Sequence, residues 1–127
     1  LKFKATIKMT FFADGICGNV IRPNQPSVVL TEGSSTTLSC TYDGSAYSLH
    51  WYRQKPGSKP EFLLLIMKSS KTVVPASPPH PHMAIRLRNN NDVDLEISSA
   101  AVSDSALYYC ALDSRFSHFK TEHTDIN

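Results

Sequence analysis

The stretch that decides the fold is Asp-Ser-Ala-Leu-Tyr-Tyr-Cys at residues 104–110. On a strand, successive side chains point to opposite faces, so Ala106, Tyr108 and Cys110 share one face while Leu107 and Tyr109 share the other. We interpret a cysteine in line with a tyrosine two residues earlier as one half of a sandwich core. Such a cysteine needs a partner and a large apolar neighbour.

Both are found upstream, at Cys40 and at Trp51, the only tryptophan. The order Cys40, Trp51, Cys110, ending in Tyr-Tyr-Cys, resembles the immunoglobulin variable domain. The resemblance implies an inter-sheet disulfide packed on Trp51 and a tyrosine corner at Tyr108. The expected fold class is therefore all-β, a V-type two-sheet Greek-key sandwich.

Three cysteines permit three single pairings. We prefer Cys40 with Cys110, because both lie on alternating apolar segments that flank Trp51. A disulfide that closes so long a loop stabilises a fold by about 4 kcal/mol in the chain-entropy model, and it implies an oxidising compartment. Cys17 is then left over, either as an unpaired thiol in a tail or as a site of intermolecular pairing.

The chain has 127 residues, which is enough for one sandwich domain. Its 13 basic and 11 acidic residues give a net charge of +2, so no strong field toward nucleic acid is expected and no nucleic-acid partner is predicted. No run of 18 apolar residues occurs, so the sequence encodes no membrane span.

Alternating patterns predict strands near residues 26–31, 36–42, 49–54, 61–67, 83–88 and 93–98, followed by a short helical crossover at 100–104. Residues 62–66 are apolar throughout, so that strand is expected to be buried on both sides, by the core and by a partner chain. In residues 93–98, Asp94 is expected to point outward. The core is expected to contain four residues from these segments: Trp51, Tyr108, Leu95 and Ile97.

Three regions are expected along the chain. Residues 1–18 are interpreted as a leader remnant or non-domain tail, 19–112 as the variable domain, and 113–127 as an atypical tail in place of a joining segment. In the family the last strand begins at Phe-Gly-x-Gly and lies beside the strand of Cys110. Residues 114–127 contain no glycine, so Phe116 and Phe119 are expected to form an imitation of that strand at best.

Within the family, Trp51-Tyr52-Arg53-Gln54 and the segments 60–66 and 95–99 look like a T-cell receptor alpha or delta variable segment over residues 26–112. The resemblance implies antigen-contact loops containing Asp43, Ser45, Tyr47, Lys68, Ser69, Lys71, Leu112 and Asp113. It implies a partner-chain interface containing Tyr52, Gln54, Pro60, Phe62 and Tyr109. For Tyr52 and Tyr109 the alternative is that they are partly exposed sheet aromatics without a partner.

The implied partners are a second variable-domain chain of beta or gamma type, a peptide on a major histocompatibility molecule, and CD3-type signalling subunits that bind outside this segment. The implied location is the cell surface, on the extracellular side of the plasma membrane. Two alternatives remain open: a non-rearranging V-type innate receptor or adhesion domain, and a non-functional germline segment.

In the family, Asp104 pairs with an arginine at the start of the strand near residue 83. The register places His82 there, so we predict a His82–Asp104 pair, with Arg86 as the alternative. His80 and His82 have no Cys or carboxylate at ligand spacing beside them, so no metal is predicted. No catalytic motif or cofactor-binding loop is present, and neither enzyme activity nor a cofactor is expected.

Overall fold

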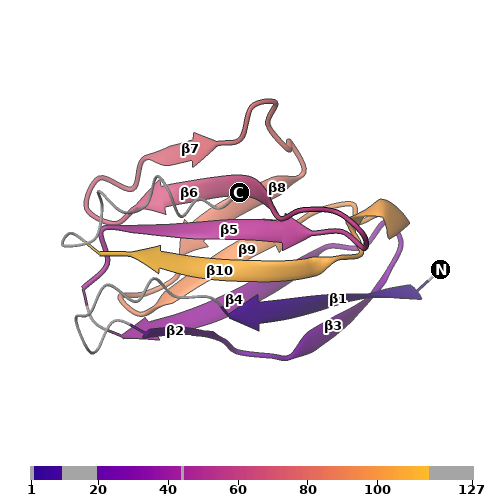
Figure 1. The fold of residues 1–127 in the computed structure, drawn as a ribbon, viewed down its shortest axis with the longest axis horizontal. Helices are drawn as coiled ribbons and strands as arrows, with labels where there is room; N and C mark the ends of the chain where they lie inside the picture. Colours follow the sequence, from indigo (N-terminus) through magenta and orange to yellow (C-terminus); the bar gives the residue numbers. More distant parts are fainter. Residues whose placement is uncertain (1, 10–19, 44, 115–127) are drawn as a thin grey trace.

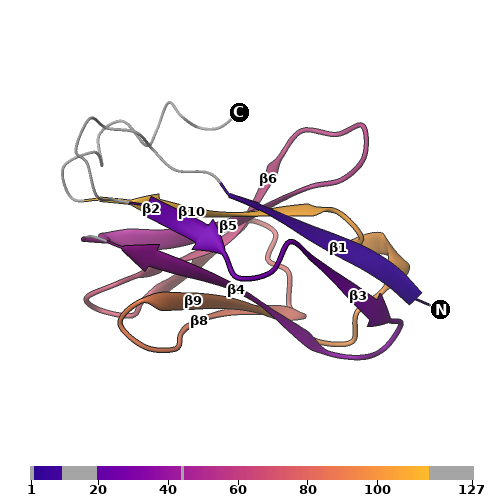
Figure 2. The same cartoon turned by 90° about the horizontal axis from the view of Figure 1, so that it is seen from below.

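Two β-sheets face each other in the computed structural model, which describes residues 2–9, 20–43 and 45–114 (Figure 1). Figure 2 shows the two layers from the side. The six-stranded sheet has the order β3 (Ser27–Thr31), β1 (Lys2–Met9), β10 (Leu107–Asp113), β5 (Ser48–Gln54), β6 (Glu61–Met67), β7 (Val73–Pro75). The four-stranded sheet has the order β2 (Val20–Pro23), β4 (Thr36–Asp43), β9 (Asp92–Ile97), β8 (Met83–Leu87).

A disulfide between Cys40 of β4 and Cys110 of β10 joins the two sheets. Trp51 pairs directly with Cys110 across β5 and β10 and is fully buried. The expected pairing of Cys40 with Cys110 is therefore present, and alternate residues of β4 and β8 are buried in the core. The four expected core residues are all buried: Trp51, Tyr108, Leu95 and Ile97.

A β-bulge explains the apolar run in β6. Trp51 pairs with Leu64 but Tyr52 pairs with Phe62, so Leu63 is the extra residue. Leu63 and Leu64 are both buried as a result, while Phe62 is half-buried on the outer side. The apolar run thus serves the core on one side and an aromatic outer face on the other.

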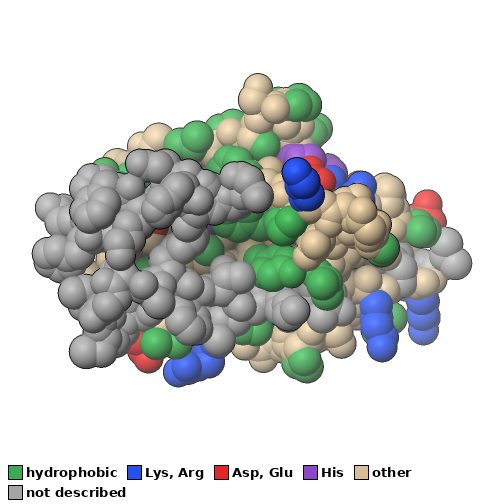
Figure 3. All heavy atoms as spheres, in the orientation of Figure 1, with side chains coloured by type: hydrophobic (Ala, Val, Ile, Leu, Met, Phe, Trp, Pro, Cys, Tyr) green, Lys and Arg blue, Asp and Glu red, His purple; other side chains and the backbone are tan. Residues whose placement is uncertain are grey.

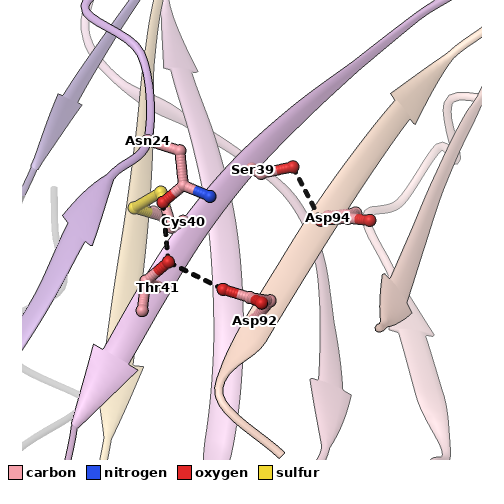
Figure 4. Close-up of a disulfide and its surroundings, with 7 residues drawn as sticks. Asn24, Ser39, Cys40, Thr41, Asp92 and Asp94 are labelled. Carbon is pink, nitrogen blue, oxygen red and sulfur yellow. Dashed lines mark hydrogen bonds between the residues drawn. A yellow bond between two sulfur atoms is a disulfide. The ribbon is translucent and has the colours of Figure 1, made fainter. Parts of the chain in front are cut away.

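Asp94 points away from the core, as expected, but it is only 1% exposed, which the alternation pattern did not predict. Figure 4 shows Ser39 and Asp94 linked on adjacent strands close to the disulfide. The Ser39 hydroxyl donates to Asp94 at 2.8 Å, and Arg88 Nε donates to the same carboxylate at 3.0 Å. The long Arg88 side chain provides a counter-charge, which makes burial of the carboxylate tolerable.

Lys2–Met9, expected to lie outside the fold, forms β1 within the six-stranded sheet. Its first half pairs antiparallel with β3 and its second half pairs parallel with β10. Ala5 is 1% exposed and belongs to the core, whereas Lys4 is exposed. The spaced lysines imitate the start of a leader, but the same spacing leaves alternate positions free to face the core.

The identity of residues 1–18 as a leader remnant stays a prediction. Cys17, Phe116 and Phe119 lie outside the described residues. In the part of the chain that the structure describes, no helix is long and apolar enough to cross a membrane.

Candidate functional site

The outer face of the six-stranded sheet carries a cluster of aromatic side chains. Tyr52 of β5 pairs with Tyr109 of β10 on one side and with Phe62 of β6 on the other. The rings of Tyr52 and Phe62 meet edge to face, with centroids 5.7 Å apart. All three side chains are half-buried, so each still offers apolar area to solvent. We call Tyr52, Gln54, Phe62 and Tyr109 the aromatic face.

Gln54 is held in place within this face. The Tyr109 hydroxyl donates to Gln54 Oε1 at 2.8 Å, and Gln54 Nε2 donates to the Ser58 carbonyl at 2.9 Å. A side-chain amide has two donor hydrogens and two acceptor lone pairs, so these bonds leave one of each. Gln54 is thus oriented by its own chain while it keeps the capacity to bind a second glutamine.

Hydrophobic side chains gather over β5 and β10 in the part of this face that Figure 3 shows uncovered. Pro60 is exposed in the turn that leads into β6, next to the face in sequence. A shallow hollow at the rim is lined by residues that include Lys4, Gln54, Lys55 and Leu107. β1 therefore contributes a lysine to the edge of the aromatic face.

His50 is a buried member of the same strand that sequence reasoning did not single out. Its Nε2 lies 2.7 Å from Ser48 Oγ, and its Nδ1 lies 3.4 Å from the Tyr52 hydroxyl. Burial lowers the pKa of His50 from 6.5 to about 4, although the nearby Asp113 carboxylate acts in the opposite direction. The signal in the sequence was its position two residues before Tyr52, on the same side of the strand.

The three expected contact segments meet at one end of the sandwich, through the backbone of Tyr47. The Tyr47 N–H donates to the Asp113 carbonyl at 2.7 Å, and the Tyr47 carbonyl accepts from the Lys68 N–H at 3.0 Å. Tyr47 lies in the first segment, Lys68 in the second, and Asp113 at the end of β10. Main-chain hydrogen bonds thus fix how the segments cross at this end of the sandwich.

Five of the expected contact residues are exposed, and these are Asp43, Ser45, Tyr47, Ser69 and Lys71. Lys68 is half-buried, with its Nζ 5.2 Å from the centroid of the Tyr42 ring. This cation–π contact ties the second segment to the base of the first. Gly44 lies outside the described residues.

Leu112 and Asp113 do not belong to a contact loop. Both lie in β10, paired with Leu49 and Ser48 of β5, and they are 3% and 4% exposed. The strand continues past the position where the third loop was expected to begin. The pairing of β10 with β5 extends to Ser48, the first residue of β5. Both side chains are therefore buried and do not form an open contact surface.

Asp104 lies at the centre of a buried ionic cluster. His82 Nε2 is 3.0 Å from Asp104 Oδ1, as predicted, while Arg86 instead pairs with Glu96 at 2.6 Å. Arg53 Nη1 also approaches Asp104 Oδ1 at 3.3 Å, a contact that sequence reasoning missed. The Tyr108 hydroxyl donates to the Asp104 carbonyl, which completes the tyrosine corner.

Opposing effects set the protonation of Asp104. Burial raises the pKa of its carboxyl, but a hydrogen bond from the Ala101 N–H, together with His82 and Arg53, outweighs burial and holds the pKa below 3.8. The carboxylate is therefore charged near neutral pH. It fixes the crossover η1 (Val102–Asp104) against β5.

The two histidines that were weighed as metal ligands each have a carboxylate partner instead. His80 Nε2 lies 3.5 Å from Glu61, and His82 contacts Asp104. Within residues 2–9, 20–43 and 45–114, no group of three His, Cys, Asp or Glu side chains gathers in a way that could hold a metal ion.

Comparison with known proteins agrees with this architecture. A family model described as the immunoglobulin V-set domain matches residues 23–127. The T-cell receptor alpha chain V region CTL-F3 of Mus musculus is 38% identical over 98 residues, which is 75% of this chain and 70% of that protein. T cell receptor alpha variable 18 of Homo sapiens is 38% identical over 97 residues, 75% of this chain and 82% of that protein.

The immunoglobulin iota chain of Homo sapiens is also similar, with 35% identity over 97 residues. The match covers 72% of this chain and 66% of that protein, so the chain spans about two thirds of the length of this relative.

Proposed function

The chain belongs to the immunoglobulin V-set family, and we propose that it is the antigen-recognition variable domain of a T-cell receptor alpha/delta-type chain. V-set domains and T-cell receptor variable segments are receptor domains and not enzymes. The observation that carries the proposal is the combination on one sandwich of an aromatic face with an oriented glutamine and an end where loops meet.

The aromatic face is the surface that would meet a second variable domain of beta or gamma type. Aromatic residues are enriched in protein interfaces and charged residues are depleted at their centres. Tyr52, Phe62 and Tyr109 provide rigid apolar area, and the free donor and acceptor of Gln54 provide one polar contact of fixed direction. Lys4 and Lys55 at the rim would favour an acidic residue on the partner.

The end of the sandwich around Tyr47 would contact a peptide bound to a major histocompatibility molecule. Asp43, Ser45, Tyr47, Ser69 and Lys71 are exposed there and combine an aromatic ring with hydroxyls and both signs of charge. Tyrosine and serine are typical of antigen-binding loops because they give contact area and adaptable hydrogen bonding at low entropic cost. The domain would act on the extracellular side of the plasma membrane, in a receptor with CD3-type signalling subunits.

A second candidate is a non-rearranging V-type innate receptor or adhesion domain. The observation that favours it is β1, which lies beside β10 where the family places its last strand. A sheet completed from the N-terminal side would not need a joining segment. Full-length transcripts distinguish the candidates: a joining segment and a constant domain support the first, and an uninterrupted membrane-anchor exon supports the second. Transcripts that contain neither feature would indicate a non-functional germline segment.

Pairing is tested by mixing the refolded chain with T-cell receptor beta and gamma variable domains and measuring association by sedimentation velocity. The double variant Tyr52→Arg with Gln54→Ala should weaken pairing by about 30-fold or more, as expected for residues at the centre of an interface. The matched control is Arg86→Ala, an exposed position on the opposite sheet. Equal pairing by both variants, or no pairing by the parent chain, would contradict the proposed interface.

A further inference from the structure

β1 lies between β3 and β10, which do not pair directly with each other. Its residues Lys2 to Thr6 pair with β3, and its residues Thr6 to Met9 pair with β10. In the described part of the sheet β3 has β1 as its neighbour on one side and forms the edge on the other. Without β1, both β3 and the adjoining edge of β10 would present unpaired N–H and C=O groups. Such edges are templates for pairing with another extended segment.

The position that β1 occupies accepts a strand in one register. Ala5 is buried in the core, while Lys2 and Lys4 on the alternate positions are exposed. A slip by one residue would place either Lys4 or Thr6 where Ala5 lies, and burying an unpaired ammonium or hydroxyl group is costly. The place between β3 and β10, here called the strand slot, thus selects a segment with a small apolar residue flanked by polar ones, as Ala5 is by Lys4 and Thr6.

Among the residues that the structure describes, no turn joins β1 directly to β3 or to β10. Its neighbours Leu30 and Leu107 are distant in sequence, and the segment connects onward only through residues 10–19, which lead to β2. Ten residues reach at most about 35 Å when extended, comparable with the diameter of a small domain. The backbone pairs of β1 would be the same whether the strand came from its own chain or from a neighbour.

From these observations we infer that the strand slot is a strand-binding site that exchanges Lys2–Met9 between copies of the chain, giving a strand-exchanged dimer. Exchange of an identical element is a low-cost route to dimers because every contact is retained. The tether gives the strand an effective concentration in the millimolar range, so the monomer dominates in dilute solution and exchange increases with chain concentration. This inference is independent of the receptor function proposed above.

Engineered disulfides test the exchange in the full-length chain on a Cys17→Ser background. Lys4 and Val29 pair across β1 and β3 and are both exposed, so cysteines at these positions should lie within bonding reach. Lys4→Cys and Val29→Cys in one chain should form an intramolecular bridge. Failure of that bridge, with the Cys40–Cys110 disulfide intact by mass spectrometry, would overturn the strand slot itself.

Exchange is then measured by refolding two differently tagged chains together, one with Lys4→Cys and the other with Val29→Cys. At roughly 0.1 mM chain, about a tenth of the molecules should be recovered as mixed-disulfide heterodimer, given the millimolar effective concentration of the tether. The control mixture replaces Val29→Cys by Arg86→Cys, an exposed position on the other sheet. Heterodimer at or below the level of the control would overturn the exchange.

Discussion

Arg53 of β5 and Asp104 of η1 form a buried ion pair, with Arg53 Nη1 3.3 Å from Asp104 Oδ1. The two side chains are 7% and 6% exposed, so both charges have left bulk water. Arg53 Nε also lies 3.4 Å from Glu61 Oε1, outside hydrogen-bonding geometry. Removing one member of such a pair leaves the other buried and uncompensated, which costs more than the pair itself contributes.

Asp104→Asn should therefore lower the free energy of unfolding by about 3 kcal/mol at pH 7, measured by urea denaturation. The matched control is Glu96→Gln, because Glu96 pairs with the exposed Arg86 on the four-stranded sheet. An exposed pair contributes less than about 1 kcal/mol, so that variant should be near the parent chain. If both variants lose the same free energy of unfolding, the buried pair of Asp104 contributes no more to stability than the exposed pair of Glu96.

The same carboxylate predicts a dependence on pH. The folded-state pKa of Asp104 is lower than 3.8, so its contribution is present above pH 3.8 and is lost as pH falls through the folded-state value. The stability difference between the parent chain and Asp104→Asn should therefore shrink in acid. Urea denaturation at pH 7 and at pH 3 measures it, and a difference that grows in acid would contradict the assignment.

His50 predicts a second pH effect, at higher pH. Its pKa is about 4 in the folded chain and 6.5 when exposed, so only the unfolded chain takes up a proton between these values. The contribution of His50 is complete above pH 6.5 and declines as pH falls toward 4, by about 3 kcal/mol in total. His50→Gln should remove most of the decrease in the free energy of unfolding between pH 6.5 and pH 4. His80→Gln, at a more exposed site, should leave most of that decrease in place. If His50→Gln has the same pH dependence of stability as the parent chain, the effect does not come from His50.

Ala5 and Lys4 are adjacent in β1 but differ in exposure, which gives a matched test of its place in the sheet. Ala5→Asp would bury a carboxylate without a partner and should reduce stability by about 3 kcal/mol or more. Lys4→Asp changes an exposed side chain and should have an effect within about 0.5 kcal/mol. Thermal unfolding of both variants is the measurement. Similar behaviour of the two would show that β1 does not pack as described.

Two substitutions of Tyr109 separate the contribution of its aromatic ring to pairing from that of its hydroxyl. Tyr109→Phe removes the hydroxyl that donates to Gln54 and should weaken pairing about fivefold, the value of one hydrogen bond. Tyr109→Ala removes the ring as well and should weaken pairing by about 30-fold or more. Titration calorimetry with the partner variable domain measures both. Equal losses would mean that the ring contributes no contact beyond its hydroxyl.

The main sandwich could be derived from the sequence because its signals are local. Alternation places Leu38, Cys40 and Tyr42 on one side of β4, and the structure buries all three. The same rule separated Trp51 from Tyr52 and so distinguished the core from the aromatic face. His82 as the partner of Asp104 followed from the family resemblance together with the register of that strand.

Other features depended on chain segments that meet only in the folded state. Arg53 reaches Asp104 across 51 residues, and Asp94 is buried because Arg88 and Ser39 close over it. β1 is the largest difference between the expected and the observed fold. It pairs with β3 and β10, and the sequence of residues 2–9 does not indicate which strands it will pair with.

The sequence by itself determined which side of the expected strands faces the core, and it separated the aromatic face from that core, because side chains of neighbouring strand residues point to opposite faces. The Cys40–Cys110 pairing was expected from the segments that flank Trp51 and from the family resemblance. Only the tertiary structure decided which strand completes the sheet beside β10, how far β10 extends, and which charges are buried. Those outcomes depend on backbone edges and side chains brought together from distant positions, and an open strand edge accepts a suitable segment from anywhere in the chain.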